Sequence, residues 1–192
     1  GLVSELFSSP LVTNATHTAT YDENGEVVAV SRRDHLCAAL DNRLGFTDVC
    51  GLHAITAAQA RAIVPSIAAG LPSDGYGRGS VAPVLPNQPT LFYRAGLENI
   101  CEAVAAQTID VVAAKQVANV KQWSSKSSDA AIADFVGIVM GLAPSDPRTK
   151  PATDLLTMHL TKATAGGATA SNALKSTFVA ACLAPSSVSI GL

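Results

Sequence analysis

The chain has 192 residues, of which 15% are charged and 48% are hydrophobic, and its formal net charge is -2. This length suits one well-buried core, and such a balanced charge lacks the basic patch that a phosphate backbone requires, so we expect no nucleic-acid partner. No uncharged apolar run reaches the roughly 18 residues of a membrane-spanning helix, so we also expect no transmembrane segment.

The N-terminal part predicts an extended arm followed by a β-hairpin. Residues 1–17 are polar and carry no periodic pattern. Asn24-Gly25 then lies between two short segments rich in Thr, Tyr and Val, which predicts a hairpin over 18–30 closed by a tight turn. The chain begins with Gly and shows no basic leader, a pattern typical of a mature exported form.

A helical pattern follows the predicted hairpin. Leu36, Leu40 and Leu44 share one face of a helix predicted over 32–44. Gly45 comes directly after it, where a C-terminal cap belongs.

Residues 71–89 predict a long loop, since four prolines and three glycines interrupt any periodicity. Loops of this length in compact domains are usually functional or mobile, so this one is a candidate binding loop. Its candidate binding residues are Tyr76, Arg78 and Ser80, because neighbouring glycines let backbone amides approach an anion and Arg78 adds a charge-assisted contact. The stretch lacks the ending of a P-loop, so a plain turn is the alternative.

Further helices are predicted in the C-terminal half, separated by Gly, Pro and Ser. A long helix is predicted over 91–111 after Thr90, and the apolar pattern that follows allows it to extend to Trp123. Its buried stripe is predicted to contain Leu97, Ile100, Cys101, Val104 and Thr108. Beyond a Ser-rich break, one apolar helix ends at Gly141, another covers 152–164, and the last begins at residue 171 and stops before Pro185.

Two cysteines and two histidines lie close together in HLCAALDNRLGFTDVCGLH. They are ligand types for tetrahedral zinc: His35, Cys37, Cys50 and His53. On a helix, however, His35 and Cys37 point to nearly opposite sides, and Cys37 belongs to the apolar stripe. A Cys37–Cys50 disulfide is therefore the preferred interpretation, while a buried thiol pair and a zinc site are the alternatives.

The other two cysteines favour a second disulfide. Cys101 and Cys182 each lie on the apolar stripe of a predicted helix, so a bridge between them would join distant parts of the chain. Paired cysteines persist mainly in oxidising compartments. We therefore expect an exported protein in the periplasm, at the cell surface or outside the cell.

The sequence contains no familiar catalytic, zinc-protease or nucleotide-binding motif, so we expect no cofactor and lean against an enzyme. Met158 is expected in the core, beside a surface or hydrogen-bonded His159, rather than as a haem ligand. A mixed-charge turn is expected to supply helix-start contacts and surface ion pairs: Asp146, Arg148, Lys150 and Asp154.

These patterns predict a mainly α fold, a single-domain bundle of about six helices over 18–192 with one N-terminal hairpin, stabilised by disulfides. The preferred function is an exported, non-enzymatic binding domain, and we expect a protein partner or self-association. One alternative is a structural subunit of an extracellular or cell-surface assembly, whose exposed strand edges pair between chains. The other is a metal-binding protein or enzyme that uses Cys50 and His53.

Overall fold

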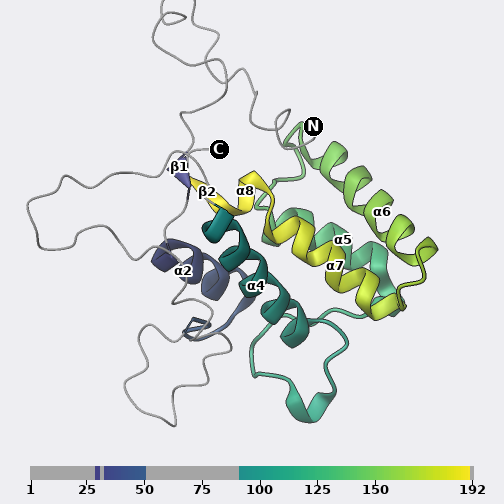
Figure 1. Ribbon diagram of the computed structural model, residues 1–192, viewed down its shortest axis with the longest axis horizontal. Coiled ribbons are helices and arrows are strands. Elements are labelled where there is room, and N and C mark those ends of the chain that lie inside the picture. Colours follow the sequence, from purple (N-terminus) through teal and green to yellow (C-terminus); the bar gives the residue numbers. More distant parts are fainter. Residues whose placement is uncertain (1–28, 31–32, 51–90, 191–192) are drawn as a thin grey trace, which may run out of the picture.

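The computed structural model describes residues 29–30, 33–50 and 91–190, which form a mainly α-helical bundle (Figure 1). The described part contains six α-helices: α2 (Arg33–Leu44), α4 (Leu91–Thr108), α5 (Ser128–Asp134), α6 (Thr149–Ala165), α7 (Ala170–Cys182) and α8 (Pro185–Val188). Shorter helical turns are η1 (Ala113–Lys115), η2 (Ser125–Ser127) and the π-helical η3 (Phe135–Val139), which continues α5.

Strand structure in the described residues is limited to one short pair. β1 (Ala29–Val30) and β2 (Ser189–Ile190) are antiparallel, with Ala29 opposite Ile190. The expected arm over 1–17 and most of the expected hairpin over 18–30 lie outside the described residues. The last two residues of that hairpin pair with the C-terminal segment, so the structure gives the hairpin no support.

Helix α7 lies at the centre of the bundle and packs against both α4 and α6 (Figure 1). Its buried positions recur at helical spacing: Ala173, Leu174, Thr177, Phe178, Ala181 and Cys182. The hydroxyl of Thr177 donates to the carbonyl oxygen of Ala173 at 2.8 Å, so the polar group on this face has a partner. One continuous hydrophobic core therefore joins α7 to its neighbours.

Three aromatic rings form the middle of this core. Trp123 and Phe178 each lie against Phe135, with ring centroids 5.1 and 5.3 Å away and nearly perpendicular planes. Edge-to-face packing of this kind is favourable beyond the area that it buries. The indole nitrogen of Trp123 donates to the carboxylate of Asp134 at 2.9 Å, which satisfies its N–H at the edge of the core. Trp123 thus fixes its own segment onto α5, η3 and α7.

The predicted stripe of α4 is confirmed, since all five of its residues are buried. The predicted extension of this helix to Trp123 is wrong, because α4 ends at Thr108. Ile109 and Trp123 instead pair as an isolated parallel bridge, and Asp110 adopts a positive φ of 51°. The backbone hydrogen bonds of this bridge replace those that a continuing helix would form. The Val-rich stretch between the two residues also has low helix propensity.

The prediction that the last helix stops before Pro185 is confirmed, since α7 ends at Cys182, and Pro185 is the first residue of α8, a position where its missing N–H is not needed. One prediction about α6 is wrong. Met158 is not a core residue, because 44% of it is exposed. Leu156 is the buried residue of α6, and Met158 lies outside the face of that helix that packs on the bundle.

Candidate interaction site

The four cysteines form the two disulfides that the sequence favoured. Cys37 bonds to Cys50, which ties α2 to the turn after it, and Cys101 bonds to Cys182, which ties α4 to α7. The zinc alternative is therefore wrong for the oxidised chain, because two of its ligands, the sulfurs of Cys37 and Cys50, are bonded to each other. The side chain of His35 and all of His53 lie outside the described residues.

The predicted binding loop over 71–89, with Tyr76, Arg78 and Ser80, also lies outside the described residues. Within the described ranges, no three His, Cys, Asp or Glu side chains gather closely enough to bind a metal ion. None of the described helices is long and apolar enough to cross a lipid bilayer.

The described part presents a different exposed feature, the loop of residues 110–122 between α4 and η2. It projects from the end of α4 at the bottom of Figure 1. Backbone hydrogen bonds close its base, since Asp110 N donates to Trp123 O at 2.9 Å and Trp123 N donates to Thr108 O at 2.7 Å. A surface loop whose ends meet in this way is an Ω-loop, a type that is frequently functional.

A second attachment holds the 110–122 loop against α2. Lys121 N donates to Leu44 O at 2.9 Å, so the loop caps the C-terminal end of α2. Gly45 lies so close that a Cβ atom at its position would be 2.3 Å from the carbonyl oxygen of Asn119. Only glycine allows this approach, and Gly45 also has the positive φ of 79° expected of the cap.

Side-chain amides add further attachments to the loop. Gln122 Nε2 donates to Gln107 O on α4 at 3.1 Å, and Gln116 Nε2 donates to Val111 O within the loop at 2.9 Å. Together with the backbone bonds, these contacts fasten the loop at its base, at α2 and within the loop itself.

The side chain of Asp110 stabilises the base of the loop. Its carboxylate accepts a hydrogen bond from Ser125 N at 2.9 Å. Burial alone would raise the pKa of Asp110, but hydrogen bonds from Ser125, Ser171 and Ser124 outweigh it and lower the pKa. The charge is thus stabilised by contacts that join the loop to η2 and to the start of α7.

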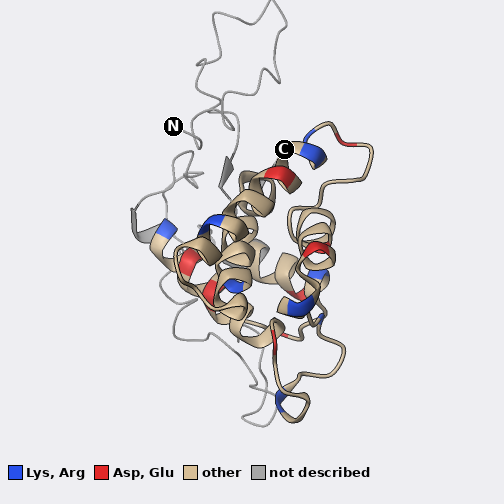
Figure 2. Cartoon of the chain, turned by 90° about the vertical axis from the view of Figure 1, so that its right-hand side faces the viewer, with Lys and Arg blue, Asp and Glu red and all other residues tan. Residues whose placement is uncertain are grey.

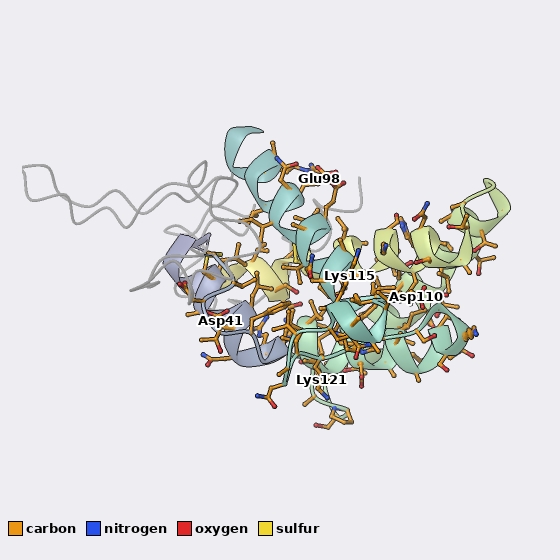
Figure 3. All side chains as sticks on the ribbon, turned by 90° about the horizontal axis from the view of Figure 1, so that it is seen from below. Asp41, Glu98, Asp110, Lys115 and Lys121 are labelled. Atoms are coloured by element: carbon orange, nitrogen blue, oxygen red, sulfur yellow. A yellow bond between two sulfur atoms is a disulfide. The ribbon has the colours of Figure 1, made fainter. Side chains whose placement is uncertain are left out.

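The segment of the loop around η1 carries exposed apolar and basic side chains. Val112 is 61% exposed, and Ala113, Ala114 and Lys115 follow it as exposed residues. Figure 2 shows charged residues dispersed singly over the helices, with a basic position on the loop that projects at the bottom. In Figure 3, Lys115 and Lys121 both come from this loop, whereas Asp41 and Glu98 come from α2 and α4.

Other polar pairs in the described part have structural roles. His159 Nε2 and Ser176 Oγ are 2.7 Å apart and link α6 to α7, as expected of a hydrogen-bonded His. No third group in this part of the chain is hydrogen-bonded to His159, so the pair lacks the orienting partner of a catalytic triad. Asp146 with Arg148 and Lys150 with Asp154 form the predicted surface ion pairs, at 2.8 and 2.6 Å.

Sequence reasoning missed the 110–122 loop because its valines and alanines fit a helical pattern. A usable signal was present in Asp110 and Asn119, residue types that tolerate a positive φ and adopt it here at 51° and 67°. They bracket the segment in which the helix was wrongly extended.

Comparisons with known proteins add no family to this description. No protein-family model matches the chain, and neither a curated protein nor a solved structure was found to be similar to it.

Proposed function

We propose that the protein is an exported, non-enzymatic binding domain that contacts a protein partner through the 110–122 loop. The observation that carries this proposal is the exposure of Val112, 61%, directly before η1 in a loop whose backbone is fastened at its base and to α2. Val112 and Met158 are the large hydrophobic residues that are exposed in the described part, and Val112 is the more exposed.

The construction of the loop suits binding. Burying an exposed valine against a partner contributes about 1.5 kcal/mol or more. A flexible loop would lose part of this gain when it becomes ordered, whereas a loop already held in one conformation avoids that cost. The fastened backbone thus makes a small apolar contact more effective.

The two disulfides support export, because such bonds persist in oxidising compartments. The absence of familiar catalytic motifs from the sequence favours binding over catalysis, as argued above. The structural-subunit alternative requires self-association, so it predicts that the partner is a second copy of the chain.

The test compares Val112→Asp with Met158→Asp as a matched control on α6. Each protein is immobilised and exposed to the extracellular fraction of the cells that produce it. We expect a partner retained by the wild type and by Met158→Asp to be lost by Val112→Asp, because a buried unpaired carboxylate disfavours the contact. Identical partners on all three proteins would contradict the proposal. Light scattering on the same proteins shows whether the partner is a second copy.

A further inference from the structure

We infer that the partner surface is acidic, so that the 110–122 loop docks with Val112 as an apolar anchor and its exposed lysines facing carboxylates. The inference rests on the proposed function and deepens it. It follows from how charge is distributed along this part of the chain. Between Asp110 and Asp129 the sequence carries three lysines and no acidic residue: Lys115, Lys121 and Lys126.

All three lysines are exposed, and each belongs to the loop or to the turn that follows it. None forms an ion pair within the described residues, whereas Lys150 and Arg148 elsewhere on the surface pair with Asp154 and Asp146. Of the two acidic residues that flank this segment, Asp110 uses its carboxylate on the backbone of Ser125, and Asp129, three positions after Lys126, forms no ion pair with it within the described residues. The three lysines are therefore free of ion pairs within the described residues and available to a partner.

A protein surface fits these residues better than a membrane or a nucleic acid. Membrane-binding surfaces insert bulky residues such as Trp, Phe and Leu, and this loop presents Val112, Ala113 and Ala114 instead. Phosphate recognition favours the planar arginine side chain, and residues 110–127 contain none. Small apolar side chains on a projecting loop suit a shallow recess, and exposed lysines on the same loop suit carboxylates on the partner.

The test titrates the full chain with poly-L-glutamate at low salt and follows the fluorescence of Trp123, which lies at the base of the loop. The test variant is Lys115→Glu/Lys121→Glu. The control is Lys150→Glu/Lys162→Glu, which makes the same change in net charge on α6. We expect salt-sensitive binding by the wild type, a loss of about tenfold in the loop variant and at most about a twofold change in the control.

Equal binding of poly-L-glutamate by the two variants would overturn the inference of an acidic partner. It would not affect the loss of the partner expected for Val112→Asp, so the two proposals can fail separately. Vesicles of phosphatidylcholine and phosphatidylserine provide a second arm. Binding to these vesicles that is tighter than to poly-L-glutamate and depends on the loop lysines would also overturn the inference, in favour of a lipid surface. Far-UV circular dichroism and the urea midpoint verify that both variants fold.

Discussion

Gly45 joins the end of α2 to the 110–122 loop under two constraints that only glycine satisfies. Its φ is 79°, and a Cβ atom would be 2.3 Å from the carbonyl oxygen of Asn119. Gly167, after α6, shares the first constraint, with φ of 91°, but has no atom within 4 Å of the Cβ position. The two glycines therefore separate the cost of backbone strain from the cost of a clash.

We expect Gly167→Ala to lower the free energy of unfolding by about 1 kcal/mol, the cost of a left-handed backbone for alanine. Gly45→Ala should lower it by about 3 kcal/mol, since the clash with Asn119 adds to that cost. Urea denaturation measures both values. Equal shifts of the midpoint would show that the loop moves away from α2 without cost, and its fastening would then be weaker than the contacts indicate.

Asp146 is a second residue whose contacts make a prediction. The Arg148 side chain donates two hydrogen bonds to its carboxylate, and Arg148 N donates a third, which together lower the pKa of Asp146 to about 2. A depressed pKa in the folded state means that this carboxylate favours folding above its ordinary pKa of about 4. That contribution is lost as the pH falls through about 2.

An NMR titration of the carboxyl carbon of Asp146 should therefore have its midpoint near 2. Arg148→Gln should raise the pKa toward the ordinary value of an aspartate, because the charge and one donor group are removed. The backbone N–H at position 148 remains, so the rise should be incomplete. A midpoint that does not change in this variant would mean that the ion pair is not formed in solution.

At the scale of the elements, the two disulfides constrain very different lengths of chain. Cys37 and Cys50 are 13 positions apart and join α2 to an adjacent turn, whereas Cys101 and Cys182 are 81 positions apart and join α4 to α7. Closing the longer loop removes more entropy from the unfolded chain, about 4.5 kcal/mol against about 3 kcal/mol. The longer bridge also lies between helices that pack through the centre of the core.

We therefore expect Cys101→Ala/Cys182→Ala to lower the free energy of unfolding by about 1.5 kcal/mol more than Cys37→Ala/Cys50→Ala does. All four cysteines are buried among apolar residues, so alanine leaves a comparable space in both cases. Urea denaturation of the two double variants provides the comparison. A larger loss on removing the short bridge would show that the turn after α2 contributes more to the core than chain entropy suggests.

Most element ends could be predicted because they depend on short-range chemistry. Gly45 ends α2, and Gly141, with φ of 68°, follows the apolar helix that the structure divides into α5 and η3. The stripes of α4 and α7 were visible because helical spacing brings their apolar residues onto one face. The end of α4 could not be predicted in this way, because it depends on hydrogen bonds that Thr108 and Asp110 form with Trp123, which is distant in the sequence. The candidate site lies in that segment, so it was missed for the same reason.

At the scale of the whole molecule, the core and the disulfides act together. The described helices share one hydrophobic core, and the chain has few charges with which to supplement it. Small proteins are stable by only about 5–15 kcal/mol in total. Two bridges that together contribute on the order of 7 kcal/mol are then a large part of the stability, so the fold should depend on an oxidising environment.

This dependence makes a prediction about where the chain folds. Expressed in a reducing cytosol, it should accumulate largely as unfolded or aggregated protein, and expressed into an oxidising compartment it should be folded. Alkylation of the denatured, unreduced protein followed by intact mass measurement should then find no modified thiol in the oxidised material. A variant with all four cysteines changed to alanine is the control, since it should fold poorly in both compartments. Folded wild type with four alkylated thiols would contradict export, because the core alone would then suffice and the oxidising compartment would have no role in the fold.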